Sequence, residues 1–429
     1  MLALIGTVTV IALVGAISLN LCSPIVALIV FPLAGGLAAG LGPALPKAML
    51  DGVVQVAPVV AMFVFAVLFF GVMMDAGLLD PLLSRALRAI AGHPVRLVMG
   101  TAALALLVHL DGSGVVCFLV VIPAVAPLYD ALSIDRRVLA CAASMAAGVN
   151  VLPWTGPTLR AAAALHLSPA VIFGPMIPVE AVGVGLVLAI AAWMGVRAAR
   201  SGQTARGGQE PGPRAPAADL TLRRPGRFWI NLILASVALG VLVAGVAPPA
   251  VVFMLATAAA LSVNYPRLAD QRARIAAHAP AALSTALVVL AAGAFIGIMG
   301  ASGMLAAMAH ELAGLAPKAG GSHIPFALSL FAAPLSLLFD PDSFYFGVLP
   351  VLADAHRTLG GQPVQVAQAA LVGQMTLGFP VSPLTPATFL VAGLSGVELS
   401  AHQKFTAPWL WGISLAMAAS CVLLRLFPI

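Results

Sequence analysis

Long apolar runs alternate with short polar segments along almost the whole chain of 429 residues. A helix that spans a lipid bilayer needs roughly 20 predominantly apolar residues. We therefore predict about ten transmembrane helices, over residues 2–19, 24–42, 53–74, 138–166, 170–197, 228–246, 249–264, 281–301, 363–395 and 407–427. The pattern indicates an all-α polytopic membrane protein.

Two further apolar stretches do not fit a simple span. Residues 94–132 and 323–357 each contain two short apolar arms separated by a polar break, DGSG at 111–114 and DPDS at 340–343. Each arm is too short to cross a bilayer comfortably, whereas a re-entrant helical hairpin enters and leaves on the same side. We predict a re-entrant hairpin at each of these two positions.

The distribution of Lys and Arg favours this topology. With both hairpins re-entrant, the basic residues gather on one side of the membrane, in segments 75–96, 130–137, 197–227, 264–280 and 396–406. The other side carries only Lys47, Lys318 and Arg357. Because cytoplasmic loops are enriched in Lys and Arg, the basic side is predicted to be cytoplasmic and both termini periplasmic.

In this topology the chain consists of two halves of opposite orientation. Each half has three helices, one hairpin, one interrupted helix and one closing helix, which predicts an inverted-repeat transporter. The predicted organisation is scaffold helices (1–93), a first transport segment (94–197), a linker (198–227), further scaffold helices (228–322) and a second transport segment (323–429). We interpret the Arg-, Pro- and Gly-rich linker as a flexible cytoplasmic tether rather than a regulatory or lipid-binding segment.

Composition excludes a soluble protein. Hydrophobic residues make up 61% of the chain and charged residues only 8%, with a mean hydropathy of +1.07, whereas soluble domains carry about 25% charged residues. The net charge of +6 follows the loop bias and does not indicate nucleic-acid binding.

The apolar run at 2–19 lacks a basic region before it, so we expect a retained first helix in a bacterial inner membrane rather than a signal peptide. The four cysteines show no disulfide or metal pattern, and the pairs Gly36/Gly40 and Gly293/Gly297 predict close helix packing rather than a dimer seam.

Polar residues that are costly in lipid gather at the hairpin tips and at two helix breaks. In the first half these candidates for a substrate site are Asp111, Ser113, Gly114, Asn150, Thr155, Gly156, Thr158 and Arg160. In the second half they are Asp340, Asp342, Ser343, Ser382, Thr385 and Thr388. The spacing from Asp111 to Pro157 equals that from Asp340 to Pro386, which indicates that the two stretches are structural repeats.

The chemistry of these residues suits an organic anion and a cation. Pro and Gly free backbone groups at the breaks, half-helix N-termini attract carboxylates, and the guanidinium of Arg160 matches a carboxylate. Asp111, Asp340 and Asp342 suit a metal ion or a proton, while the hydroxyls, amides and Arg160 suit the substrate.

Single residues also allow other interpretations. The two tip aspartates could face water, Asp342 could cap a helix, and Arg160 could pair with an acid or reach the surface. His109 and His402 suit local hydrogen bonds or a proton relay, and Glu180 and Glu398 are weaker candidates near helix ends.

At these residues the sequence resembles the citrate–metal:proton symporter family of the ion-transporter superfamily. The matching stretches are HLDGSG (109–114), NVLPWTGPTLRAA (150–162), DPDSFYFGVLP (340–350), SPLTPATFLVAGLSGVEL (382–399) and HQKFT (402–406). The resemblance implies proton-coupled uptake of citrate with a divalent cation such as Mg²⁺, by an elevator-type mechanism in a homodimer. Ser113 stands where a second acid is expected in such a motif, and the loss of a carboxylate weakens a cation site or changes the coupling ion.

Other functions within and beyond this class share some of these features. A dicarboxylate or other organic-anion symporter coupled to protons or sodium fits all of them. A membrane-embedded enzyme would need a convergent catalytic set, and the sequence contains no such motif. An ion channel would need a continuous polar pore. We expect no enzyme activity, no tightly bound cofactor and no nucleic-acid partner, but a small organic acid as substrate and the lipid bilayer as surroundings.

Overall fold

A computed structural model describes the chain except residues 20, 82–84, 86–88, 91, 113, 202–219, 244–245, 316–322, 340 and 429. Ser113 and Asp340, two of the predicted site residues, therefore lie outside the described residues, as does the side chain of Asp111. The central part of the predicted linker lies outside them as well.

The described part of the chain is helical and contains no strand. The first half consists of α1 (Leu2–Ser18), α2 (Pro24–Ala38), α3 (Leu45–Asp75), α5 (Pro94–Val108), α6 (Gly114–Ala131), α7 (Arg136–Val149), α8 (Gly156–Leu165), α9 (Pro169–Phe173) and α10 (Ile177–Ser201). The second half consists of α11 (Phe228–Val243), α12 (Pro249–Asn264), α13 (Leu268–Ala301), α14 (Met304–Leu315), α15 (Ile324–Leu335), α16 (Leu349–Thr358), α17 (Pro363–Gly373), α18 (Phe379–Val381), α19 (Pro386–Ser395) and α20 (Leu399–Leu423). Short 3₁₀ segments are η1 (Gly42–Ala44), η2 (His109–Asp111), η3 (Gly174–Met176), η4 (Leu220–Leu222) and η5 (Pro225–Arg227), and two π-helices are η7 (Ser343–Val348) and η8 (Gln374–Gly378).

Five stretches of this helical structure are long and apolar enough to cross a membrane: Gly42–Asp75, Pro169–Arg200, Pro225–Leu242, Leu268–Ala301 and Leu399–Leu423. A sixth is Pro363–Val381 with Pro386–Ser395, which bends by 47° at its break. Other apolar helices are shorter, for example α2 with 15 residues and α12 with 16. At 1.5 Å per residue these cover about 25 Å or less, below the roughly 30 Å of a bilayer core. The chain is a multi-pass membrane protein, and the count of about ten spans stays a prediction.

Apolar side chains on the outside of the bundle identify the surface that faces lipid. Leu4, Val54, Trp229 and Leu255 are each about two-thirds exposed or more, at 67%, 66%, 71% and 67%. They come from α1, α3, α11 and α12, so large apolar residues are exposed over several helices. Such a surface would be unstable in water but is normal against acyl chains.

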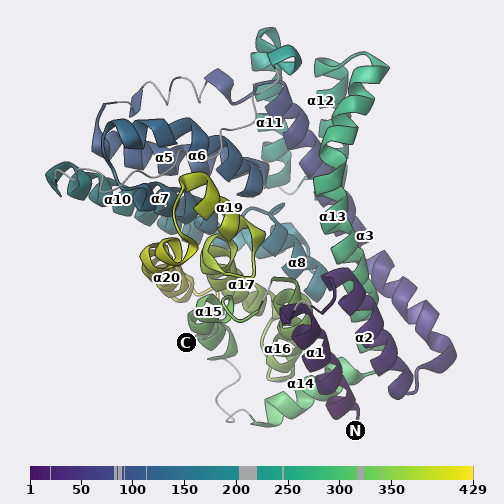
Figure 1. Cartoon of the computed structure of the whole chain (residues 1–429). Coiled ribbons are helices and arrows are strands. Elements are labelled where there is room, and N and C mark those ends of the chain that lie inside the picture. The colour runs from purple at the N-terminus through teal and green to yellow at the C-terminus, as the bar shows by residue number, and fades with distance from the viewer. Residues whose placement is uncertain are drawn as a thin grey trace.

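A long crossing pair, α3 and α13, forms the centre of one side of the molecule (Figure 1). A β-carbon on Gly52 of α3 would clash with the backbone of Gly293, and one on Gly297 would clash with the Ala48 carbonyl oxygen. The glycine pair Gly293/Gly297 therefore lets two helices within one chain approach closely, which confirms the packing interpretation. Helix α12 packs against α3, and α2 packs against α13.

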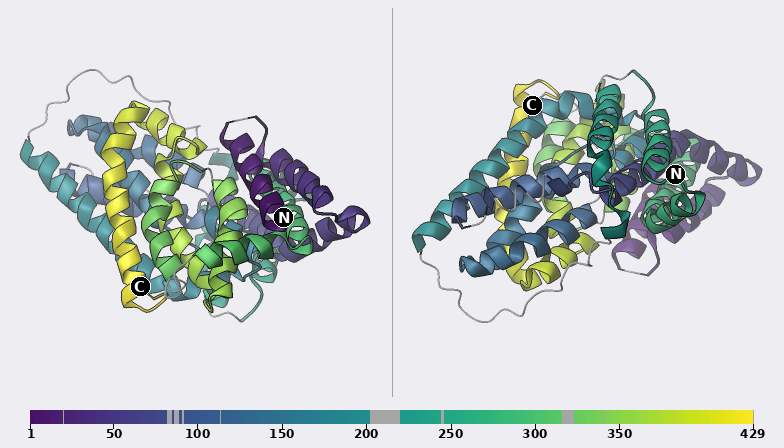
Figure 2. Two further views of the ribbon diagram at one scale, coloured as in Figure 1. Left: turned by 90° about the horizontal axis from the view of Figure 1, so that it is seen from below. Right: turned by 90° about the horizontal axis from the view of Figure 1, so that it is seen from above.

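Helices α5, α6, α7, α10, α15, α17, α19 and α20 form the other side of the molecule (Figure 1). Helix α5 packs against α7 and α10, and α15 packs against α17 and α20. The two closing helices, α10 and α20, lie next to each other (Figure 2). The half-helix α8 contacts both α3 and α13.

The sequence-based assignment differs from the structure in several places; for example, α3 begins at Leu45 rather than near residue 53, and α20 at Leu399 rather than near residue 407. Helix α13 begins at Leu268 rather than near residue 281, because the Arg- and Ala-rich segment before the apolar run also favours helix. Helix α14 was not predicted, since its 12 residues are too few for a span. The last residues of the linker contact the helices: the Arg224 guanidinium carbon lies 4.9 Å from the centroid of the Tyr265 ring, and Arg223 forms an ion pair with Asp80.

Candidate functional site

Two helices are interrupted at the positions that the sequence predicts. Helix α7 ends at Val149, and the chain stays non-helical until α8 begins at Gly156. In the second half, α18 ends at Val381 and α19 begins at Pro386. Both restarts have a proline in the first two helical positions, where its missing N–H group costs no hydrogen bond.

The two restarting half-helices are built alike. Each has 10 residues and is preceded by an extended threonine, Thr155 for α8 and Thr385 for α19. The hydroxyls of Thr155 and Thr158 lie 3.2 Å apart, and those of Thr385 and Thr388 lie 2.9 Å apart. Both half-helices end at a left-handed residue, His166 with φ 54° and Gly396 with φ 65°. The predicted equivalence of the two breaks therefore extends to their hydrogen bonding and their ends.

The tip of the first hairpin is bound to the break of its own half. The indole Nε1 of Trp154 donates to the Leu110 carbonyl at 2.9 Å, and the Asn150 amide donates to the Leu106 carbonyl at 3.3 Å. Gly112, next to Asp111 in the tip, has φ 77°, a backbone conformation that favours glycine. The Asn150 side chain thus connects the broken helix to the first arm of the hairpin.

The same tip also touches the break of the other half. A β-carbon on Gly114 would clash with the ring of Phe379, the first residue of α18. That ring also stacks with His109 at 6.0 Å between centroids and with Phe118 at 5.7 Å. The structure therefore places Gly114 against an aromatic side chain, which would have to shift to admit a β-carbon.

An ion pair joins the second hairpin to the first break. Nε of Arg160 on α8 lies 2.5 Å from Oδ1 of Asp342, within the second hairpin's polar tip. Their side chains are 18% and 13% exposed. Asp342 makes no capping hydrogen bond, so of the two interpretations of Arg160 and Asp342 the ion pair is the one observed.

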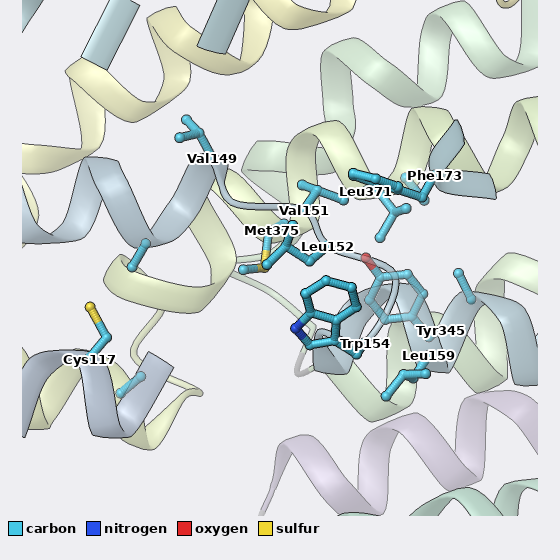
Figure 3. Packing of buried hydrophobic residues seen from close by; sticks show 14 of the residues in the cluster. Cys117, Val149, Val151, Leu152, Trp154, Leu159, Phe173, Tyr345, Leu371 and Met375 are labelled. Atoms are coloured by element: carbon cyan, nitrogen blue, oxygen red, sulfur yellow. The ribbon is translucent and has the colours of Figure 1, made fainter. Parts of the chain in front are cut away.

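Buried aromatic residues surround this region. Figure 3 shows Trp154 of the first break, Leu159 of α8 and Tyr345 of η7 in one cluster of packed residues. Tyr345 and its neighbour Ser343 are fully buried within the π-helix η7, a helix type that is frequent at functional sites. The Tyr345 hydroxyl has no hydrogen-bond partner among the described residues, and neither does Nδ1 of His109.

The remaining predicted hydroxyls mainly satisfy the backbone that the breaks set free. Thr155 donates to the Leu152 carbonyl at 2.8 Å, and Thr385 has the Phe379 carbonyl as an acceptor at 2.9 Å. Ser382 accepts from the Leu384 N–H at 3.2 Å. Because buried backbone groups need partners, these side chains stabilise the breaks in addition to lining them.

Three polar side chains of the second half bond backbone carbonyls: for His402 the sequence allowed a local hydrogen bond, whereas Gln403 and Gln374 were not singled out in it. Nε2 of His402 on α20 lies 2.9 Å from the Pro380 carbonyl oxygen, and the neighbouring Gln403 donates to the Val381 carbonyl at 2.9 Å. Gln374 donates to the carbonyl of Ala332, on α15, at 3.1 Å. The available signal was a polar residue inside an apolar run, but the sequence cannot show which carbonyl it reaches.

No group of three or more His, Cys, Asp or Glu side chains that could hold a metal ion occurs among the described residues. Asp342 is the one predicted cation ligand whose side chain is described, and it pairs with Arg160.

A cavity of about 430 Å³ lies between the α3–α13 pair and the end of the first half-helix. Its polar lining includes Asp51 and Gln55 of α3, His166 at the end of α8, and Asp354 and Arg357 of α16. Arg160 lies on the same half-helix as His166, on the order of 9 Å away along its axis. The cavity therefore lies at the C-terminal end of the half-helix that carries Arg160.

Apolar helices with paired polar breaks inside the bundle define the class: a polytopic membrane transporter. The chain belongs to the citrate transporter family, whose model matches residues 1–373. It is 39% identical over 428 residues to a citrate transporter of Bacillus subtilis (strain 168), covering 99% of both chains. It is 36% identical over 428 residues to the Mg(2+)/citrate complex secondary transporter of that organism, covering 99% of this chain and 98% of the relative. The family resemblance is confirmed, and the family consists of transporters rather than enzymes.

Solved structures agree on the fold. The transporter YdaH of Alcanivorax borkumensis, whose topology is described as unusual, aligns with a TM-score of 0.60. The alignment covers 88% of this chain and 87% of that chain at 15% identity. At this identity the likeness concerns the fold alone.

Proposed function

We propose that this protein takes up citrate as a complex with a divalent cation, together with protons, by alternating access. Membership of the citrate transporter family and the two Bacillus subtilis relatives, one of them a Mg(2+)/citrate complex transporter, support the cargo. A complex of citrate with Mg²⁺ carries less net charge than free citrate, which lowers the electrostatic cost of crossing a low-dielectric barrier.

The observation that carries the site assignment is the Arg160–Asp342 pair. It brings a cationic and an anionic side chain from the two predicted motifs within 2.5 Å of each other, in the interior of the bundle. In the proposed site, Arg160, the half-helix amides and the hydroxyls receive the carboxylates. Asp111, Asp340 and Asp342 receive the cation or the proton.

The proposed alternating access rests on an inverted repeat. Three features support it: the equal lengths of α8 and α19 and the extended threonine before each, the reciprocal packing of α12 on α3 and of α2 on α13, and the contacts of each hairpin with the opposite break. In an elevator-type mechanism, the hairpins and broken helices of 94–197 and 323–429 move against the scaffold helices of 1–93 and 228–322. The scaffold of a homodimer would hold the moving parts in place.

The proposed orientation follows the basic loops. The linker 198–227 lies in the cytoplasm and both termini lie in the periplasm of a bacterial inner membrane. The cavity beside Arg357 then opens toward the periplasm, since Arg357 belongs to the side with few basic residues.

Uptake of labelled citrate into proteoliposomes tests the function. The measurement compares Mg²⁺, Ca²⁺ and a chelator, each with and without an inward proton gradient. We expect saturable uptake that needs both a divalent cation and the gradient. Saturable uptake of another dicarboxylate or tricarboxylate that citrate does not inhibit would overturn the substrate, and equal uptake in the chelator would overturn the metal complex.

A further inference from the structure

The phenol of Tyr345 is a buried polar group that the proposed site leaves unused. Its side chain is fully buried, and its hydroxyl has no hydrogen-bond partner among the described residues. A buried hydroxyl that gives up its bonds to water and gains none in the protein destabilises the fold. Few polar groups in native proteins are left in this state, so the hydroxyl calls for a reason beyond packing.

The other tyrosines of the chain show the usual arrangement. The sequence contains three tyrosines in all. The Tyr129 hydroxyl donates to the Thr101 hydroxyl at 3.1 Å, and the Tyr265 hydroxyl donates to the Leu222 carbonyl at 2.9 Å. Tyr345 is therefore the one tyrosine whose hydroxyl no group within the described residues satisfies.

The fold does not need a hydroxyl at this position. Tyr345 stands between Phe344 and Phe346, and all three side chains are fully buried. At the matched place in the first hairpin, five residues after Asp111, the chain has the apolar Val116. A phenylalanine would fill the same space without burying an unsatisfied donor, so packing alone does not explain the oxygen of Tyr345.

The Tyr345 hydroxyl also differs from the other buried atoms without a partner. Within the described residues these are Oγ of Ser144, Oγ of Ser395 and Nδ1 of His109. Each serine lies in a helix, where a rotation of the side chain brings a carbonyl of the preceding turn within reach. Nδ1 of His109 can be the unprotonated ring nitrogen, which is not a donor. The Tyr345 oxygen stands at the far end of a rigid ring, so only another group can satisfy it.

Tyr345 packs against the half-helix that carries Arg160. It belongs to the π-helix η7, which contacts α8. Figure 3 shows its ring near Leu159 and Trp154, with its oxygen on the side of the first break. Asp342, three residues before Tyr345, forms the ion pair with Arg160, which directly follows Leu159. One interface between the two halves therefore contains both the ion pair and the unpartnered hydroxyl.

A carboxylate is the acceptor that suits this hydroxyl. A phenol has one O–H to donate, whereas an ionised carboxylate only accepts hydrogen bonds. A hydrogen bond to an ionised acceptor is roughly twice as strong as one between neutral groups. An organic anion beside the Arg160 guanidinium would supply such an acceptor at the interface where Tyr345 lies.

We propose that the Tyr345 hydroxyl donates a hydrogen bond to a carboxylate oxygen of the cargo, beside Arg160. This inference rests on the proposed uptake of citrate. For the cargo to enter, η7 and α8 separate, which releases Arg160 from Asp342 and uncovers the phenol. The hydroxyl then has its partner when the cargo is bound, whereas the closed form without cargo carries an unsatisfied donor. Tyr345 therefore favours closure around the cargo over closure without it.

Tyr345→Phe tests the proposal, because it removes one oxygen and keeps the ring. We expect KM for Mg²⁺–citrate uptake into proteoliposomes to rise about 10- to 100-fold, the effect of losing a hydrogen bond to a charged group. The maximal rate should stay within about threefold of wild type, since the bond contributes to binding throughout transport. In thermal unfolding, the Mg²⁺–citrate concentration that gives half of the maximal rise in Tm should increase by the same factor as KM.

Tyr129→Phe is the matched control, since it also removes a fully buried phenol oxygen, but one that has a partner. It should lower Tm and leave KM for Mg²⁺–citrate unchanged. An equal rise of KM in Tyr129→Phe would overturn the assignment, because the effect would then not be specific to Tyr345.

Two further results would overturn the role of Tyr345. One is an unchanged KM in Tyr345→Phe. The other is a Tyr345→Phe protein that does not fold or that melts several degrees below wild type without cargo, because the hydroxyl would then serve the fold. If the wild-type protein shows neither saturable citrate uptake nor a rise in Tm with Mg²⁺–citrate, the proposed function itself fails, so the two failures can be told apart.

Discussion

The ion pair between Arg160 and Asp342 offers the sharpest test of the site. We consider three variants: Arg160→Gln, Asp342→Asn and the double variant. The pair is short, at 2.5 Å, and both side chains are less than one-fifth exposed. Removing one partner of a buried pair leaves an uncompensated charge and costs about 3–5 kcal/mol. The double variant leaves no charge behind, so its stability should return to within about 1 kcal/mol of wild type.

The expected shift in melting temperature can be worked out from the chain length. The entropy of unfolding is about 2 cal/mol/K per residue, or roughly 0.9 kcal/mol/K for 429 residues. A loss of about 3–5 kcal/mol then lowers Tm by about 3–6 °C. Helices that persist in detergent reduce the entropy of unfolding, so the measured shift should be at least this large.

A thiol-reactive fluorophore can follow this unfolding, because Cys117, Cys141 and Cys421 are fully buried and become reactive only when the helices separate. Citrate uptake should be lost in all three variants, since the double variant restores stability but not the guanidinium. Two results would refute the reasoning: a double variant whose destabilisation equals the sum of the single ones, or a double variant that transports citrate with unchanged KM.

The remaining predictions concern packing and buried polar groups. Gly297→Ala should destabilise the protein by about 2 kcal/mol or more, because the added β-carbon meets a carbonyl oxygen of α3. Gly300→Ala, which has open space around its β-carbon, should not destabilise it. Equal melting temperatures of the two variants would contradict this prediction. Tyr345→Phe should leave Tm equal or slightly higher, since it removes a buried hydroxyl that has no partner among the described residues; a loss of several degrees would contradict this. His402→Leu should cost about 1–3 kcal/mol in thermal unfolding, because the Pro380 carbonyl loses its donor, and an unchanged Tm would show that another group replaces it.

Local features of the sequence were sufficient to predict the helices and their breaks. Both helix restarts, at Gly156 and Pro386, lie within the predicted breaks, because Pro and Gly act on the backbone at their own positions. The glycine seam at Gly293 and Gly297 was also predictable, since small residues at this spacing allow close approach of helices. Helix lengths were less predictable. The start of α13 depended on helix propensity outside the apolar run, and hydropathy does not measure helix propensity.

The partners of the polar residues were not predictable. Arg160 and Asp342 are 182 residues apart in the chain, and a sequence pattern cannot say which acid a buried arginine reaches. The same holds for Phe379, whose ring fills the space beside Gly114. These contacts depend on how helices from the two halves pack together.

By itself, then, the sequence determined that this is a membrane protein, that its polar residues gather in two matched breaks, and that it resembles citrate–metal symporters. Composition and local backbone chemistry are properties of short segments, so no folding was needed to recognise them. Only the tertiary structure decided that each hairpin meets the break of the opposite half and that the Arg160 guanidinium is held by Asp342. Contacts between distant segments arise from side-chain packing in three dimensions, which the order of residues along the chain does not display.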